Sequence, residues 1–297
     1  MTECRIRKPL FILATGRAGS TVLYRMLSEH PRTRRLTRFA RRSGGLWRLL
    51  DRVAMWAVDA PLVGGPVKRP VEGGGEHYDF WDRLYPGFRD TFRDLTAEDA
   101  TPRVVRDIRR ELSARVGASE DRRFLLKLTG WPRTGFLKHI FPDARFTHII
   151  RDGRAVANSW LNVPWWTGWN GPRNWRWGPL SDERLREWES CGRSFIALAA
   201  IQWKVLMDAF EAARAQCPEE HWLQVRYEDL CARPAETVAR IAQHCALPPS
   251  RTFRRRLKAC GLRNANFKWR RDLTDRQQDM LNDLLGEYLD RYGYGSD

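Results

Sequence analysis

Short apolar runs that end in glycine-containing or charged turns recur along the chain. The first run covers residues 9–14 and leads into the small-residue segment 15–21 (TGRAGST), after which apolar residues recur at helical spacing over 22–27. Pro31 then stops the helix, because proline removes a backbone donor and clashes with the preceding turn. The pattern predicts a strand, a glycine-containing loop and a helix.

Three further runs have the length and composition of buried strands, at residues 124–128, 146–150 and 222–227. The run at 146–150 ends in a charged turn and is followed by a helical pattern, so it repeats the order of the first unit. Strands that alternate with helices predict an α/β fold, a three-layer α/β/α arrangement with a central parallel sheet and a P-loop-like phosphate site. We expect one domain over 1–297, with irregular insertions around 32–85 and 162–182.

The chain is strongly basic, with 52 Lys plus Arg against 36 Asp plus Glu and a formal net charge of +16. Such an excess favours an anionic partner. The basic residues are scattered over many short segments, so the charge alone does not indicate nucleic acid. A non-catalytic basic nucleic-acid-binding protein stays as the alternative from another class, supported by aromatic residues interleaved with arginine around 165–177.

The six cysteines are widely spaced and form no CxxC pair, which favours reduced thiols. The sequence also contains no HExxH motif, the pattern of many zinc sites. The segment after the first methionine has no apolar run typical of a signal peptide. The apolar stretch 46–63 is interrupted by four charged residues and cannot span a bilayer. We therefore expect a cytoplasmic protein with no integral membrane segment and no metal.

The segment 15–21 is suited to bind an anion. Free N–H groups at the start of the following helix and the helix dipole both attract negative charge. Its two glycines let the backbone curl closely, Ser20 and Thr21 add hydroxyl donors, and Arg17 adds a fixed charge. A Walker A loop needs a lysine after the second glycine, where Ser20 stands. An ATP-dependent, P-loop kinase-like transferase is therefore only a second alternative.

A second anion site is indicated farther along the chain. Arg151 stands at the carboxyl end of the predicted strand 146–150, where open α/β sheets bind ligands, and Ser159 follows eight residues later on the next helix. Both side chains can converge on a phosphate. On this fragment alone, a surface Arg–Asp turn with a solvent-facing serine is an equally good interpretation.

Together and in this order, the two motifs resemble those of the sulfotransferases that use 3′-phosphoadenosine 5′-phosphosulfate (PAPS). The family's motifs read like PKSGTT or RSGTT and like RDPRAV or RDGRAV followed by Ser; here they read GRAGST at 16–21 and RDGRAV at 151–156 with Ser159. Further agreement comes from FPDARF at 141–146, RYEDL at 226–230 and YGY at 292–294. The resemblance is to bacterial-type members and implies transfer of a sulfuryl group from PAPS to a hydroxyl or amine.

By this resemblance, the loop 17–21 holds the 5′-phosphosulfate of PAPS, and Arg151 with Ser159 holds the 3′-phosphate. The product is adenosine 3′,5′-bisphosphate (PAP). Arg17 stands where many members carry a catalytic lysine, and an arginine stabilises charge but hardly donates a proton. The candidate cofactor-binding residues are Gly16, Arg17, Ala18, Gly19, Ser20, Thr21, Arg151, Ser159, Tyr227, Lys268 and Arg270.

Three members of that set rest on weaker arguments. Val22 stands where some relatives place an aromatic residue that stacks on adenine, so Tyr227 is only a weak candidate for the adenine clamp. Lys268 and Arg270 belong to a basic cluster that also contains Arg263 and Arg271. A similar segment closes over the 3′-phosphate in relatives, and a solvated run of charge explains the cluster equally well.

Sulfuryl transfer resembles phosphoryl transfer in needing an in-line acceptor and a stabilised leaving oxygen. A general base helps the acceptor hydroxyl. The segment EHYDFW resembles a Glu-x-Tyr-x-Phe-Trp pattern of bacterial relatives, which implies Glu76 as the base. His77 is the alternative, because histidine titrates near neutrality without burial. We expect Arg17 to stabilise developing charge, with Lys127 and Arg133 as secondary candidates.

The acceptor side is indicated by a segment, 163–177, that holds five of the fourteen tryptophans. These rings could form an amphipathic platform for a small-molecule, glycan or lipid-like acceptor, or equally a satellite core that anchors a long loop. The candidate substrate-binding residues are Trp165, Trp166, Trp169 and Arg173. Nothing in the sequence separates a glycan from a glycolipid, a small natural product or a peptide.

Overall fold

The computed structural model describes residues 6–59, 71, 75–117, 122–258, 262 and 264–295. Its centre is a parallel sheet of five strands in the order β2-β3-β1-β4-β5. The strands are β1 (Leu10–Ala14), β2 (Thr33–Arg34), β3 (Arg123–Thr129), β4 (Arg145–Ile150) and β5 (Trp222–Arg226). The predicted three-layer α/β fold is thus confirmed.

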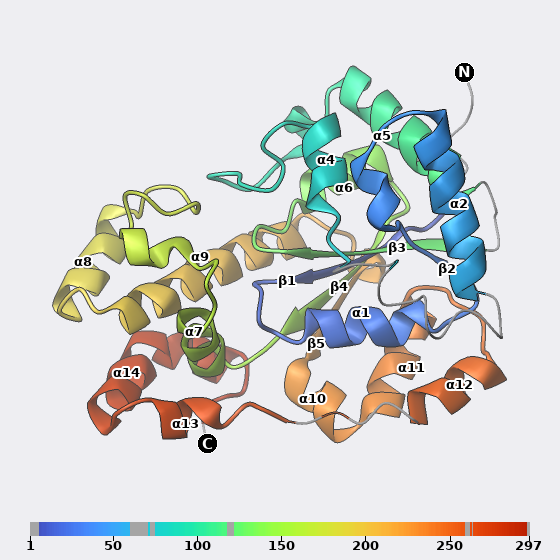
Figure 1. Ribbon diagram of the computed structural model, residues 1–297. Coiled ribbons are helices and arrows are strands. Elements are labelled where there is room, and N and C mark those ends of the chain that lie inside the picture. The colour runs from blue at the N-terminus through green and yellow to red at the C-terminus, as the bar shows by residue number, and fades with distance from the viewer. Residues whose placement is uncertain are drawn as a thin grey trace.

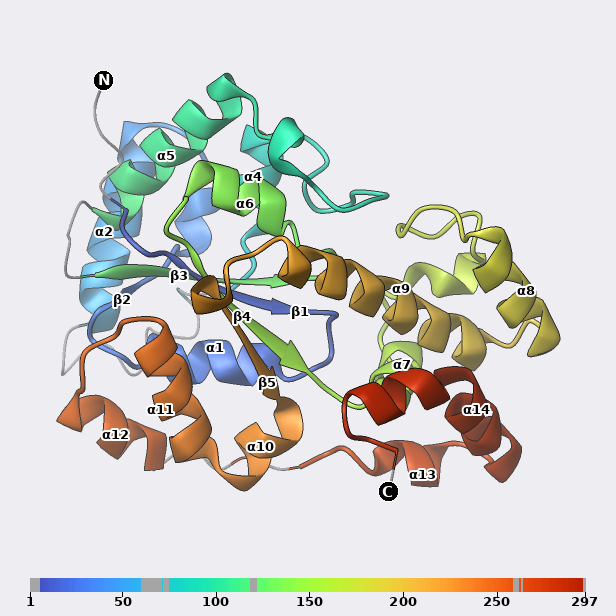
Figure 2. The same cartoon turned by 180° about the vertical axis from the view of Figure 1, so that it is seen from behind.

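Helices cover both faces of the sheet (Figures 1 and 2). They are α1 (Ser20–Ser28), α2 (Gly45–Asp59), α4 (Tyr78–Leu84), α5 (Pro102–Val116), α6 (Thr134–Ile140), α7 (Gly153–Leu161), α8 (Asp182–Ser190), α9 (Phe195–Ala215), α10 (Tyr227–Ala232), α11 (Pro234–His244), α12 (Arg251–Lys258), α13 (Lys268–Asp272) and α14 (Asp275–Arg291). Helices α1, α10, α11 and α12 lie on one face, whereas α4, α5, α6 and α9 lie on the other.

The alternation of side chains along β1 explains the two faces. Because successive residues of a strand point to opposite sides, Leu10 and Ile12 join the core under α1, α11 and α12. Phe11 and Leu13 join the larger core under α5, α6 and α9. All five residues of β1 are buried, as expected for a central strand of a parallel sheet.

The strand order brings the two predicted phosphate motifs together. Strand β1 pairs with β3 on one side and with β4 on the other, in parallel register. The chain therefore reverses its direction of travel across the sheet beside β1, and such switch points carry the ligand crevice at the carboxyl ends of the strands. The loop after β1 and the turn after β4 meet at this crevice.

Some local predictions need correction. The segment 32–85, expected to be irregular, contains β2, α2 and α4. Helix α2 was hidden because burial along it does not follow polarity: Asp51 is buried beside Met55, whereas Trp56 is exposed. The predicted strand 222–227 ends one residue early, since Tyr227 begins α10.

Candidate functional site

The loop between β1 and α1 has a backbone that curls as an anion site requires. Gly16, Arg17 and Gly19 have φ angles of 97°, 58° and 86°, in the left-handed region. Ala18, with an ordinary φ, lies between left-handed Arg17 and Gly19, and such a change of hand turns neighbouring N–H groups to one side, a geometry that binds anions. The N-cap of α1 is Gly19, which supplies no side-chain cap to the N–H groups of the first turn. Ser20 is buried at the start of that turn.

Gly19 is required by its neighbour as well as by its φ angle. A Cβ atom at this position would collide with the ring of Tyr227. Tyr227 is itself buried, and the Arg151 guanidinium lies 4.7 Å from its ring centroid. The ring therefore packs between the loop and Arg151. Tyr227 therefore supports both the loop and Arg151. Its role as the adenine clamp stays a prediction.

Arg151 joins the loop to the rest of the site. It is 8% exposed and donates to the carbonyl oxygen of Arg17 at 2.9 Å. Arg17 in turn donates through Nε to Ser159 Oγ, on α7, at 2.9 Å. The structure thus brings together Arg17, Arg151 and Ser159 from three separate parts of the sequence. They meet at the carboxyl ends of β1 and β4.

The carboxy-terminal basic segment reaches the same place. Arg151 donates to Asn266 Oδ1 at 3.0 Å and to the carbonyl oxygen of Ala265 at 2.9 Å. The backbone before α13 therefore lies against Arg151. Lys268 and Arg270 follow on α13 with exposed side chains, and Arg263 lies outside the described residues.

A buried lysine supports the loop from the neighbouring strand. Lys127, on β3, donates from Nζ to Thr21 Oγ1 at 2.8 Å and pairs with Glu76 Oε1 at 2.6 Å. Burial lowers the pKa of Lys127 below its ordinary value, and the Glu76 carboxylate opposes that shift. The loop, which lacks a lysine of its own, is therefore reached by a lysine and a carboxylate from elsewhere in the chain.

His77 has a different environment from Glu76. Its Nε2 is buried without a hydrogen-bond partner among the described residues. Burial and the nearby Lys127 charge lower the pKa of His77 to about 4. The expectation that this histidine titrates near neutrality is therefore wrong, because it assumed an exposed ring. A neutral His77 can accept a proton at neutral pH, but it is a weak base.

Arg133 is held as a structural brace. It is 1% exposed and donates to the carbonyl oxygens of Phe88 and Trp131 at distances of 2.7–3.2 Å. Its backbone N–H donates to Asp94 Oδ1 at 2.6 Å. These bonds tie the segment around residues 88–94 to the end of β3 and leave Arg133 no exposed surface for a ligand.

The tryptophan-rich segment divides into buried and exposed rings. Trp166 is buried and donates to Gln202 Oε1 of α9 at 2.8 Å. Trp165 and Trp169 are exposed by 48% and 47%. Trp169 packs edge-on against Phe195, with ring centroids 4.9 Å apart. Some rings of this segment therefore anchor the loop and others face solvent, and acceptor binding by the exposed rings stays a prediction.

This segment also borders the end of the sheet. Trp177 is buried against Gly130, which directly follows β3 and whose N–H donates to Ala14 O at 2.9 Å. Gly178 lies against the backbone of Phe92, a residue that is 67% exposed. Two loops, around 88–94 and 163–180, therefore meet beside the crevice. Arg173 is exposed on the second of them.

Sequence reasoning missed some members of this constellation. Asn266 and the Ala265 carbonyl fix the orientation of Arg151, yet neither stands in a motif. Tyr78 was passed over although its hydroxyl donates to Thr129 O at 2.9 Å, at the end of β3. Lys127 ranked only as secondary. A lysine inside an otherwise apolar five-residue run was the available signal, because buried lysines need a partner.

Comparison with known proteins places the chain in a family. Residues 9–251 match the model of the sulfotransferase family, and the chain belongs to that family. It is 25% identical over 164 residues to omega-hydroxy-beta-dihydromenaquinone-9 sulfotransferase Stf3 of Mycobacterium bovis and of Mycobacterium tuberculosis. The match covers 54% of this chain and 38% of those relatives, so it spans well under half of their length.

Solved structures agree on the fold. The chain is similar to sulfotransferase STF9 from Mycobacterium avium, with a TM-score of 0.58 and 21% identity over 96% of this chain and 77% of that one. It is also similar to sulfotransferase STF1 from Mycobacterium tuberculosis, with a TM-score of 0.54 and 18% identity over 94% and 76% of the two chains. The recognition of a bacterial-type sulfotransferase is thus confirmed.

None of the helices in the described residues is both long and apolar enough to cross a membrane. Within the same residues, no group of three or more His, Cys, Asp or Glu side chains is placed to hold a metal ion.

Proposed function

We propose that this sulfotransferase takes its sulfuryl group from PAPS and transfers it to a hydroxyl group of an apolar, lipid-like small molecule. The observation that carries the proposal is the convergence of Arg17, Arg151 and Ser159 at the carboxyl ends of β1 and β4. A nucleotide with phosphates at both its 5′ and 3′ positions needs two anion sites on one crevice. The glycine loop supplies one and Arg151 with Ser159 supplies the other.

The loop end of the site would hold the 5′-phosphosulfate. Its inward N–H groups and the start of α1 stabilise the negative charge that grows on the leaving phosphate oxygen. Arg17 adds an exposed cation and Lys127 adds a buried one, which Thr21 holds in position at 2.8 Å. The buried lysine acts more strongly than an exposed cation, because less water screens it.

Glu76 is the base we propose for the acceptor hydroxyl. As the acceptor oxygen forms its bond to sulfur, the bond between sulfur and the phosphate oxygen breaks and the hydroxyl proton passes to the Glu76 carboxylate. The ion pair with Lys127 orients that carboxylate at the edge of the loop. His77 is less suited, since its Nε2 is buried, whereas the Glu76 side chain is 22% exposed at the edge of the loop.

The exposed aromatic rings favour an apolar acceptor. Phe92, Trp165 and Trp169 are each about half or more exposed on the two loops beside the crevice. Exposed rings of this size usually serve recognition. The names of the mycobacterial relatives also specify a hydroxylated isoprenoid quinone as acceptor. A cytoplasmic location and the absence of a metal requirement remain predictions.

The test begins with calorimetric titration of PAP, with 5′-AMP as the control that lacks the 3′-phosphate. Micromolar or tighter binding of PAP that is lost for 5′-AMP supports both phosphate sites. Transfer from PAPS is then measured with long-chain alcohols and hydroxylated quinones against sugars. Preference for MgATP over PAP, or for an oligonucleotide of equal charge at moderate salt, would contradict the proposal and favour a kinase-like or a nucleic-acid-binding function.

A further inference from the structure

Helix α2 presents a stripe of apolar side chains to solvent. Leu46, Leu49, Val53 and Trp56 are exposed by 63%, 54%, 51% and 73%. Their spacing of three, four and three residues places them on one face of the helix. A solvated surface helix normally has polar residues on this face, and a contiguous apolar stripe there indicates a binding surface.

The orientation of α2 is fixed by a buried ion pair, so the stripe cannot turn inward. Asp51, on the opposite face of the helix, is 2% exposed and bonds to Arg115 of α5 and to Thr37. Arg48 of the same helix pairs with Glu111 of α5. Separating a buried ion pair leaves an uncompensated charge, which is strongly destabilising.

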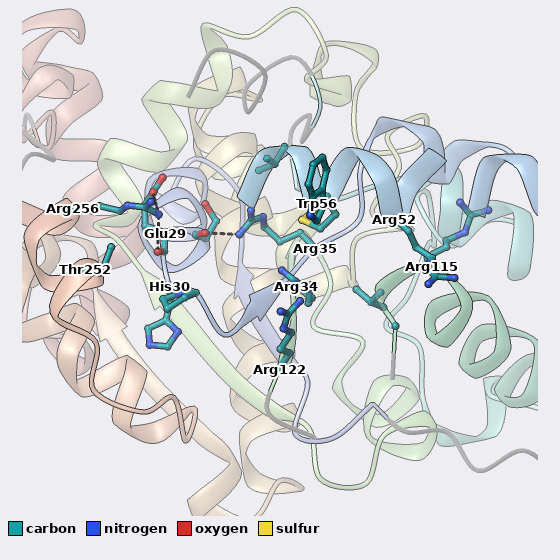
Figure 3. A pocket seen from close by; sticks show the side chains of 16 residues that line it. Glu29, His30, Arg34, Arg35, Arg52, Trp56, Arg115, Arg122, Thr252 and Arg256 are labelled. Atoms are coloured by element: carbon teal, nitrogen blue, oxygen red, sulfur yellow. Dashed lines mark hydrogen bonds and ion pairs between the residues drawn. The ribbon is translucent and has the colours of Figure 1, made fainter. Parts of the chain in front are cut away.

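A basic cavity of about 650 Å³ opens beside the stripe (Figure 3). Its wall includes Trp56 of α2 and the carboxyl end of α1. Its charged lining is almost wholly basic and consists of Arg34, Arg35, Arg52, Arg115, Arg122 and Arg256, with Glu29 as the acidic member. Arg52 and Arg122 are exposed and form no ion pair with other described residues.

Helix α12 adds further positive charge on the other side of the cavity. It lines the cavity with Thr252 and Arg256, and its remaining arginines, Arg251, Arg254 and Arg255, are exposed. No acidic residue stands between residues 251 and 258. Helices α2 and α12 lie on one side of the protein (Figure 1), and both line the cavity, α2 with Trp56 and α12 with Arg256.

We propose that this surface docks the protein onto an anionic phospholipid membrane, with α2 lying in the interface. Apolar side chains that enter the acyl boundary, flanked by arginines that reach lipid phosphates, are the signature of an interfacial helix. A nucleic acid would leave the leucines and the valine without an apolar partner. A second copy of the chain would bring like charges face to face.

The surface is separate from the site of the proposed transfer reaction. The glycine loop lies before α1, whereas the cavity is lined by Glu29 and His30 after α1. The helix between them has nine residues, which is a length of about 13 Å. The inference therefore does not depend on PAPS or on the identity of the acceptor.

The experiment is vesicle co-sedimentation of the full chain with phosphatidylcholine alone and with a phosphatidylcholine–phosphatidylglycerol mixture. We expect binding to the anionic vesicles only. The double variants L49S/W56S and R52E/R122E should each lose at least about tenfold in apparent affinity, since one arginine near the surface contributes about fivefold. Matched controls at the opposite end of the molecule, F195S and R186E/R276E, should bind like the wild type.

Each of the following results would overturn the proposal. One is binding of the wild type to neutral vesicles as strongly as to anionic ones, or to neither. A second is unchanged vesicle binding by L49S/W56S and R52E/R122E while their thermal unfolding matches the wild type. If sedimentation velocity shows a wild-type dimer that L49S/W56S loses without any effect on vesicle binding, the face belongs to a second copy and the membrane proposal fails.

Discussion

The two ends of helix α1 both favour anions, but they do so by different means. At its amino end, the glycine loop offers oriented N–H groups, and Arg151 is buried and held by three oxygen acceptors. At its carboxyl end, exposed arginines such as Arg52 and Arg122 surround an open cavity. The amino end therefore offers donors in a fixed geometry, whereas the carboxyl end offers exposed positive charge. At the carboxyl end the helix dipole opposes anion binding, so the arginines must supply the attraction.

The largest effect is expected at the amino end, from removal of the proposed base. Replacing Glu76 with Gln keeps the shape but removes the proton acceptor, so kcat for sulfuryl transfer should fall by about 10²–10⁴-fold. Binding of PAP, measured by calorimetry, should change little. His77→Gln is the matched control and should keep most of its kcat. The reverse ranking of the two variants would assign the base to His77.

Arg151→Ala should weaken PAP binding by about 1.5–3 kcal/mol, the range for a charged hydrogen bond. The loss leaves Asn266 Oδ1 and two carbonyl oxygens without their donor, so a lower melting temperature should accompany it. Calorimetry of the folded variant measures the first effect and thermal unfolding the second. Unchanged affinity in a folded Arg151→Ala protein would remove the 3′-phosphate from this site.

Salt should separate the two ends directly. Raising NaCl from about 0.1 to 0.5 M shortens the screening length and weakens exposed charges far more than buried ones. Binding to anionic vesicles should therefore fall by about tenfold or more, and binding of PAP by a clearly smaller factor. Parallel titrations of one protein preparation give both numbers. Equal salt dependence would mean that PAP binds through exposed charge as well.

The smallest effect is a loss of stability in acid that arises beside the loop. The pKa of His77 is about 4 in the folded protein and near 6.5 when unfolded. Between these values the unfolded chain binds more protons, so the free energy of unfolding falls as the pH is lowered from about 6.5 to 4. At pH 5 His77 should account for about 1–2 kcal/mol of this loss. Urea unfolding of the wild type and of His77→Gln at pH 7 and pH 5 measures this loss. An equal drop in the free energy of unfolding in the two proteins would contradict the assignment.

The fold class and the two predicted phosphate motifs could be inferred from the sequence, because both are local. Four strands are short, largely apolar runs, and the segments 16–21 and 151–159 are short enough to be read as units. Strand β2 escaped detection because two residues carry no periodicity. Helix α2 escaped because its buried face contains Asp51, whose partner Arg115 is 64 residues away.

Which side chains share an environment depends on how the whole chain folds, and no local pattern indicates it. The fold brings Lys127 to Thr21 across 106 residues and Asn266 to Arg151 across 115 residues, distances at which no local pattern exists. Burial removed His77 from the neutral titration range and turned Arg133 into a brace. The apolar stripe of α2 stays exposed to solvent, because the cost of separating the buried Asp51–Arg115 pair holds the helix in its orientation.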